Sequence, residues 1–424
     1  MVSMASDEPR NLDPSSSPCA KDNQLCVVHR YESEIIIVPV LLLGASFFVG
    51  FCIVWMICRR KREGDSEPQR GPSGSGRTDR ATDRHNLTLG VSSPNGTHMQ
   101  LDPVLSQWQI PHERLVGGLK RITQGRFGTI YQTQLTSGEV GKERTVVLKE
   151  CDESAEASLM SEFLARVKFH ASLGQHPNLV EMIGCCTDRS PLYLVLGNMN
   201  RGNLLQFLWT CRKDVMKLEE APYDVTERQV YNIAIQVASG LECLQQKGLI
   251  HGDVAARNIL LSDDFNAKLT GLHIPFEIQR AGVIRSHVSV PIKWQSPERI
   301  MKKPLTPKSD VWSFGVLLFE MISLGSPPYP DLSVSSVLQY LQRGHRMSQP
   351  ATCKAPLYSL MKQCWQWRAN TRPTITEVGK RLHNNQRAAC DRLVLQVPDQ
   401  IEPEIYANVA GTWGIEWQRD YTVL

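Results

Sequence analysis

Residues 35–58 form an apolar stretch without a charged side chain, and this feature most constrains what the chain can fold into. At about 1.5 Å per residue, a helix of this length spans the ~30 Å hydrocarbon core of a bilayer. A buried helix of a soluble domain is the alternative, but such a helix is rarely apolar on every side over this length. A cleaved signal peptide fits poorly, because the basic cluster at 59–62 follows the stretch. We therefore predict one transmembrane helix whose C-terminal side lies in the cytosol.

The segments that flank this stretch are predicted to be unstructured. Residues 1–34 are polar and too few to bury a core, although Cys19 and Cys26 could pair there. Residues 59–107 are rich in Arg, Ser, Gly and Asp, which is typical of a flexible juxtamembrane linker. Its basic cluster would attract anionic membrane lipids by ~1 kcal/mol per charge, and we expect the plasma membrane. Cys58 is either a palmitoylation site or a plain apolar residue.

Charge and cysteine content exclude two classes of function. A net charge of +4 over 424 residues gives no case for a nucleic-acid partner. The twelve cysteines show no paired C-x-x-C spacing, so we expect no zinc site.

Residues 108–388 carry the pattern of one large folded domain. Short β-rich runs at 129–135, 145–150 and 192–196 surround one helical stretch at 155–173. Longer helical patterns follow, at 227–246 and 310–324. Strands first and helices later predict an α+β fold with two lobes, a β-rich N-lobe to about 198 and a helical C-lobe from about 200.

Residues 251–258 read H-G-D-V-A-A-R-N and carry the chemistry. They resemble the catalytic loop of protein kinases, and the A-A-R-N ending resembles the receptor-tyrosine-kinase branch of that family. The resemblance implies a two-lobed kinase fold that uses ATP with Mg²⁺ or Mn²⁺ and promotes growth-type signalling. Asp253 would accept the proton of the substrate hydroxyl, Arg257 would assist it, and Asn258 would hold a metal ion on the phosphates.

Further motifs match the family in the expected order. The strand TVVLK ends in the lysine that pairs the ATP phosphates, ITQGRFGTIY resembles the glycine-rich loop, and PIKWQSPE resembles the end of the activation segment. The residues that the resemblance assigns to the nucleotide are Gly125, Gly128, Ile130, Val147, Lys149, Leu196, Gly197, Met199 and Leu260. It also implies that Asp310 anchors the catalytic loop and that Arg372 pairs with Glu298.

Several phosphate-handling positions depart from the pattern. The metal-binding D-F-G is replaced by G-L-H, so Gly271 stands where the family has its metal-binding aspartate and His273 where it has glycine. Losing one such electrostatic group typically costs ~10²–10³ in rate. Val147 should crowd the adenine, Thr123 replaces the first glycine of the loop, and Gly252 replaces the arginine of H-R-D. We therefore expect lower affinity for ATP.

Arg166 falls where the family has the glutamate that pairs with Lys149. Two facing cations would repel by ~1–4 kcal/mol at about 4 Å. Glu162 lies one turn earlier on the same face and could substitute after a shift of the helix. Alternatively, Arg166 contacts the phosphates and replaces part of the missing metal charge.

Residues 389–424 are predicted to form an exposed tail with two phosphorylation sites, Tyr406 and Tyr421. Once phosphorylated, Y-A-N-V at 406–409 would suit phosphotyrosine-reading adaptors that prefer Asn two residues on. The final T-V-L resembles a ligand of PDZ modules.

Two hypotheses of different class follow. In the first, Lys149, Asp253 and Asn258 support weak phosphoryl transfer to tyrosine. In the second, the domain is a pseudokinase, a membrane-tethered scaffold that recruits other kinases and adaptors. Four altered residues favour it: Gly271, Arg166, Val147 and Gly252. A ligand-sensing receptor is a weaker third hypothesis, because the outer segment is so short.

Overall fold

The computed structural model describes residues 102–136, 142–282, 290–392, 394–398 and 400–410. The predicted membrane helix at 35–58, both segments that flank it up to residue 101, Tyr421 and the terminal T-V-L lie outside these residues. Among the helices of the described ranges, none has the length and apolarity needed to cross a bilayer.

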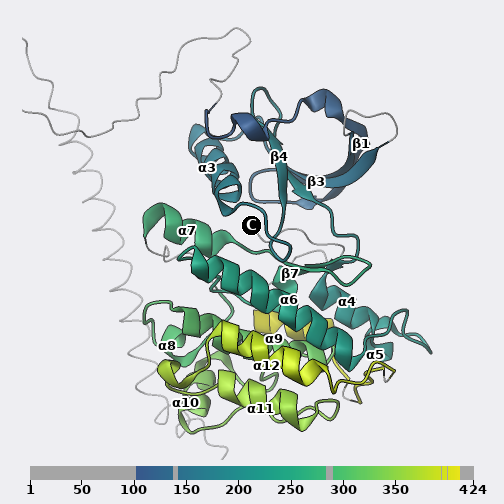
Figure 1. Cartoon of the computed structure of the whole chain (residues 1–424), viewed down its shortest axis with the longest axis vertical. Helices are drawn as coiled ribbons and strands as arrows, with labels where there is room; N and C mark the ends of the chain where they lie inside the picture. The colour runs from purple at the N-terminus through teal and green to yellow at the C-terminus, as the bar shows by residue number, and fades with distance from the viewer. Residues whose placement is uncertain (1–101, 137–141, 283–289, 393, 399, 411–424) are drawn as a thin grey trace, which may run out of the picture. The chain divides into compact units, whose positions relative to one another are not determined.

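The described residues fold into a β-rich part followed by a helical part, as the pattern of strands and helices predicts (Figure 1). Within the described part of the chain, five antiparallel strands form one sheet in the order β1-β2-β3-β5-β4. The strands are β1 (Leu115–Gln124), β2 (Thr129–Thr136), β3 (Glu143–Cys151), β4 (Met182–Cys186) and β5 (Leu192–Gly197). The predicted strands at 129–135, 145–150 and 192–196 are thereby confirmed.

The helix α3 (Ala157–Leu173) lies beside this sheet and faces the helix α7 (His273–Ala281) (Figure 1). Phe169 of α3 and Phe276 of α7 meet edge to face with ring centroids 5.7 Å apart. The activation segment thus begins as a helix packed under α3, which sequence patterns did not predict.

The helical part is built around α9 (Pro307–Ile322), which is buried along most of its length. Its other α-helices are α4 (Leu204–Thr210), α5 (Lys213–Met216), α6 (Glu227–Gln246), α8 (Pro297–Ile300), α10 (Val337–Gln342), α11 (Ala355–Cys364), α12 (Ile375–Gln386) and α13 (Pro403–Ala410). Three short strands, β6 (Gly202–Asn203), β7 (Ile259–Leu261) and β8 (Ala267–Leu269), form a small sheet. The catalytic loop at 251–258 ends where β7 begins. Short 3₁₀ turns occur at Ser106–Trp108, His112–Arg114, Ala256–Asn258, Ile292–Trp294, Val334–Ser336 and Ala369–Thr371.

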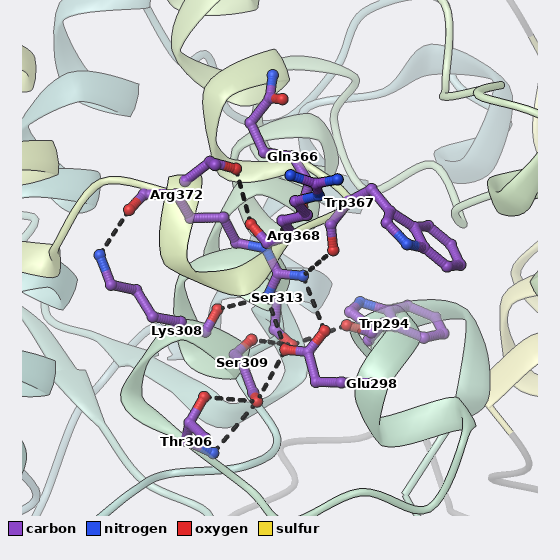
Figure 2. A network of polar contacts seen from close by, with 11 residues as sticks. Trp294, Glu298, Thr306, Lys308, Ser309, Ser313, Gln366, Trp367, Arg368 and Arg372 are labelled. Carbon is purple, nitrogen blue, oxygen red and sulfur yellow. Dashed lines mark hydrogen bonds and ion pairs between the residues drawn. The ribbon is translucent and has the colours of Figure 1, made fainter.

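A buried ion pair fixes the end of the activation segment to the helical part (Figure 2). Arg372 donates from Nη1 and Nη2 to the two carboxylate oxygens of Glu298, at 2.7 and 2.8 Å. The guanidinium also donates to the carbonyls of Gln366 and Lys308, so its hydrogen-bonding capacity is largely met. The pairing that the family resemblance implies is therefore present, and burial in this setting makes it costly to break.

Candidate active site

Asp310 of α9 holds the start of the catalytic loop from below. Its carboxylate oxygens accept the backbone N–H groups of His251 and Gly252 at 2.9 and 2.8 Å. Burial raises the pKa of Asp310 to about 7, and these two N–H groups oppose that rise. The loop-anchoring role that the family resemblance implies for Asp310 matches this geometry.

His251 fixes the loop from a second side. Its Nε2–H donates to the carbonyl of Thr270 at 2.7 Å, while its Nδ1 accepts the N–H of Asp253 at 3.2 Å. Burial lowers the pKa of His251 to about 4, so the ring is neutral at physiological pH. A neutral imidazole with this tautomer is what the two opposite hydrogen bonds require.

Asp253, Arg257 and Asn258 come together as the motif predicts. The Asn258 amide Nδ2 donates to the Asp253 carbonyl at 2.7 Å and to its carboxylate at 2.8 Å. Arg257 pairs with the other carboxylate oxygen. Burial opposes ionisation of Asp253, but the charge of Arg257 and the hydrogen bond from Asn258 favour the ionised form, and its pKa is lowered. Asp253 is therefore a carboxylate, the form that accepts a proton or orients a hydroxyl.

The position of Gly271 bears on whether a metal ion fits. Its φ is +75°, and a Cβ built there would lie 2.8 Å from Asn258 Cγ. Asn258 Oδ1 is buried and has no hydrogen-bond partner among the described residues, so it offers one oxygen ligand. No group of three or more His, Cys, Asp or Glu side chains in the described ranges could hold a metal ion. The residues present thus supply one ligand and lack the carboxylate that would clamp a divalent cation.

Gly252 and His273 show how the altered motifs are accommodated. Gly252 has a φ of +76°, and a Cβ there would lie 2.9 Å from Ile274 Cδ1 and 3.0 Å from Leu305 Cδ2. An arginine at this position would therefore collide with α7 and its surroundings. His273 begins α7; burial lowers its pKa, although the charge of Asp253 opposes this. A neutral ring at physiological pH adds no charge to the site.

The residues assigned to the nucleotide lie on the sheet and at its junction with the small sheet. Lys149 and Val147 are on β3, and Val147 is fully buried opposite Leu196 of β5. Gly197 follows Leu196 on β5, and its N–H donates to the Glu181 carbonyl at 3.0 Å. Ile130 on β2, Met199 after β5 and Leu260 on β7 are also buried.

The glycine-rich turn joins β1 to β2. Thr123, which replaces its first glycine, pairs with Ile130. Gly125 donates its N–H to the Gly128 carbonyl at 2.8 Å and closes the turn. A Cβ on Gly128 would lie 2.9 Å from the Glu150 carbonyl oxygen, so this approach of two backbones requires glycine.

The sequence suggests that Arg166 faces a second cation, but the structure also gives Arg166 an acidic partner that neutralises its charge. Its Nη2 pairs with Glu162 one turn earlier at 3.1 Å, and Glu162 also pairs with Arg126 at 2.8 Å. The guanidinium lies over the rings of Phe276 and Phe127, at 4.4 and 5.4 Å from the centroids. Burial lowers the pKa of Arg166 despite Glu162. Arg166 therefore joins α3 to α7, so a contact with phosphates would require it to leave these partners.

The prediction of an exposed Tyr406 is wrong. Tyr406 lies on α13, is 1% exposed and donates its hydroxyl to Glu320 Oε1 at 2.6 Å. The cause is the apolar face of α13, which packs on the helical part of the domain. Two sequence signals pointed to this contact. Pro403 is typical of a first helical position, and Glu320 is a lone acid inside an apolar run of α9.

Comparison with protein families gives the class of the fold and site. The model of the protein tyrosine and serine/threonine kinase family matches residues 117–382. The chain belongs to this family.

Individual members of this family are similar to the chain over different lengths. Tyrosine-protein kinase STYK1 from Mus musculus is 41% identical over 403 residues, covering 93% of this chain and 94% of the relative. The protein of that name from Homo sapiens is 41% identical over 402 residues, with 93% and 95% covered. Fibroblast growth factor receptor homolog 1 from Drosophila melanogaster is 32% identical over 288 residues, which cover 65% of this chain and 38% of the receptor.

Proposed function

We propose that this chain acts mainly as a pseudokinase scaffold in growth-type signalling, with weak or no phosphoryl transfer. One observation carries the proposal: Gly271 stands against Asn258 where a metal-binding carboxylate would be needed. Neutralising charge on the transferred phosphoryl group is the main catalytic device of kinases, so this loss lowers the rate directly. The pairing of Arg166 with Glu162 supports the same conclusion, because it engages a residue that could have compensated.

A second candidate function is weak tyrosine kinase activity. It is favoured by the ionised Asp253, by Asn258 within 2.8 Å of it and by Arg257 at its other oxygen. These groups are arranged to bind and orient a substrate hydroxyl and to accept its proton. The STYK1 relatives are named tyrosine-protein kinases, which also keeps this candidate open.

The proposal includes a membrane anchor and binding partners for the kinase-like domain. Residues 35–58 anchor the chain in a membrane, with the kinase-like domain on the cytosolic side and residues 59–62 near anionic lipids. Its partners are other kinases, adaptors that read phosphorylated Tyr406 and a PDZ module at the terminal T-V-L.

The test is a thermal shift of the full chain with ATP, with and without Mg²⁺ or Mn²⁺, followed by a phosphotransfer assay. A scaffold with this site gives the same shift with and without metal and transfers no phosphate above the level of Asp253→Asn. Metal-dependent stabilisation together with transfer that Asp253→Asn abolishes would overturn the proposal and establish the second candidate. Transfer that survives Asp253→Asn comes from a contaminating kinase.

A further inference from the structure

The segment that leads to α13 is attached to the helical part by a series of backbone hydrogen bonds. The N–H of Cys390 donates to Glu227 Oε2 at 3.2 Å. Leu395 donates to the Val225 carbonyl at 2.9 Å, and Ile401 donates to Asp214 Oδ2 at 2.9 Å. These contacts place α13 at a defined position.

The helix α13 docks through one face only. Tyr406, Ala407 and Ala410 are at most 5% exposed, whereas Ile405 and Asn408 are exposed. The Tyr406 ring meets Trp209 of α4 edge to face at 5.6 Å and Trp294 at 5.2 Å. Aromatic pairs in this geometry contribute about 0.5–1.5 kcal/mol each beyond burial.

The Tyr406 hydroxyl reaches the back of the catalytic loop. Glu320 accepts this hydroxyl on Oε1 and accepts the N–H of Ala256, a catalytic-loop residue, on Oε2 at 3.0 Å. The next residue, Arg257, pairs with Asp253 and lies 4.8 Å from the Trp294 ring centroid. Tyr406 therefore contacts Glu320 and Trp294, and both of these residues also contact the loop that holds Asp253.

Phosphorylation is incompatible with this docked position. A kinase would transfer the γ-phosphoryl group of ATP to the Tyr406 oxygen, breaking the bond to ADP and releasing the hydroxyl proton to a base. That oxygen is buried against Glu320, so α13 must leave before transfer can occur. The product carries about −1.5 to −2 charge. Returning to the docked position would bury this charge beside Glu320, which is costly even with Arg257 as a neighbouring cation.

We propose that residues 403–410 are a latch that conceals Tyr406 in the docked state and, once Tyr406 is phosphorylated, presents it to a phosphotyrosine-binding module. The inference rests on the proposed function, in which the chain recruits partners. Release also loosens the support of the catalytic loop, because Glu320 and Trp294 contact both Tyr406 and that loop.

The test measures how fast an added active tyrosine kinase phosphorylates Tyr406 in the full chain, by mass spectrometry. A synthetic peptide of residues 400–410 gives the rate for an unprotected tyrosine. Because modification requires local release, the intact chain should react more than about tenfold more slowly than the peptide. Ala407→Glu buries a carboxylate in the docked face and should bring the rate within about threefold of a peptide with that substitution.

Asn408→Glu is the matched control, since it adds the same side chain to the exposed face and should leave the protection intact. A reaction without added kinase reports transfer by the chain itself, so failure of the proposed function appears in that reaction alone. An intact chain that reacts as fast as the peptide, or an Ala407→Glu rate equal to that of Asn408→Glu, would overturn the latch.

Tyr406→Phe tests the latch if Ala407→Glu does not fold. It keeps the ring but leaves Glu320 without the hydroxyl. Hydrogen exchange in residues 403–410 and at the Ala256 amide should then accelerate together by about fivefold or more. Unchanged exchange in both segments would contradict the latch.

Discussion

Two regions of the site differ in how far they depart from the family pattern: the residues that hold the catalytic loop keep it, and the residues that handle phosphate do not. In the helical part, Asp310, Glu298 and Arg372 retain the residues of the family pattern. Asp310 accepts two backbone N–H groups of the catalytic loop, and Glu298 pairs with Arg372. On the phosphate side, Gly271 and Arg166 replace two carboxylates. The loop-holding residues stabilise the fold, because removing one partner of a buried charge is strongly destabilising. The phosphate-handling residues act in catalysis, so replacing them has little effect on folding.

Breaking the buried pair is expected to have the largest effect. Arg372→Ala leaves Glu298 largely buried without its cation, so the free energy of unfolding should fall by about 3–5 kcal/mol in urea titrations. The control is Arg144→Ala, which breaks the 2.7 Å pair with Glu181 in the β-rich part, where the arginine is 53% exposed. That change should cost less than about 1 kcal/mol. Equal losses would remove the contrast between the two kinds of ion pair.

The pH dependence of stability tests the buried acids beneath the loop. Burial raises the pKa of both Asp310 and Glu320 to about 7, from ordinary values of 3.8 and 4.5. Between those limits each of these two acids binds more protons in the folded chain, so each lowers the free energy of unfolding by about 1.4 kcal/mol per pH unit as pH rises. Below pH 6.5 the buried His251 and His170 oppose this fall, because burial lowers their pKa to about 4 and about 3.

Thermal melts from pH 5.5 to 8 measure the net slope. Below pH 7, Glu320→Gln should make this slope more positive by about 1.4 kcal/mol per pH unit, because it removes the contribution of Glu320 and leaves the other groups in place. A slope that Glu320→Gln leaves unchanged would mean that Glu320 is ionised throughout.

Restoring the missing carboxylate sharpens the comparison on the phosphate side. Gly271→Asp should lower the free energy of unfolding by about 1–3 kcal/mol, because φ is +75° and Asn258 must move. Gly282→Asp is the matched control, since its φ is +69° and nothing lies within 4 Å of its added Cβ. The difference between the two variants reports the contact with Asn258. Metal-dependent transfer gained by Gly271→Asp would identify this carboxylate as the limiting loss.

Arg166 should give the smallest effect. Its guanidinium already pairs with Glu162 and stacks on Phe276, so Arg166→Ala should change metal-free ATP affinity by less than about twofold. Equilibrium binding measured without divalent cations decides this. A loss of more than about tenfold would show that Arg166 holds the phosphates.

Local patterns in the sequence were sufficient for most of the fold. Alternating strands, amphipathic helices and the order of motifs predicted both lobes, and helix α6 occupies the predicted span of 227–246. The catalytic residues were equally predictable from the sequence, because Asp253 and Asn258 lie within one short loop. In each case the information is contained in neighbouring residues.

Contacts between distant segments were not predictable in this way. The position of the Arg166 guanidinium over the Phe276 ring depends on how α7 packs on α3. The burial of Tyr406 depends on Trp209 and Glu320, which lie far from it in the sequence. Half of the residues at 389–424 are apolar, but this composition does not identify the surface that α13 covers.

The backbone contacts of residues 390–401 have a practical consequence for anyone who produces this domain. The family match stops at residue 382, within α12, yet ordered packing continues to Ala410. A recombinant fragment trimmed to the homology limit would lose Leu395, which bonds to the Val225 carbonyl, and the helix α13, whose Tyr406 packs on Trp209 and Trp294. Its thermal stability and nucleotide binding would then describe an artificially uncovered protein.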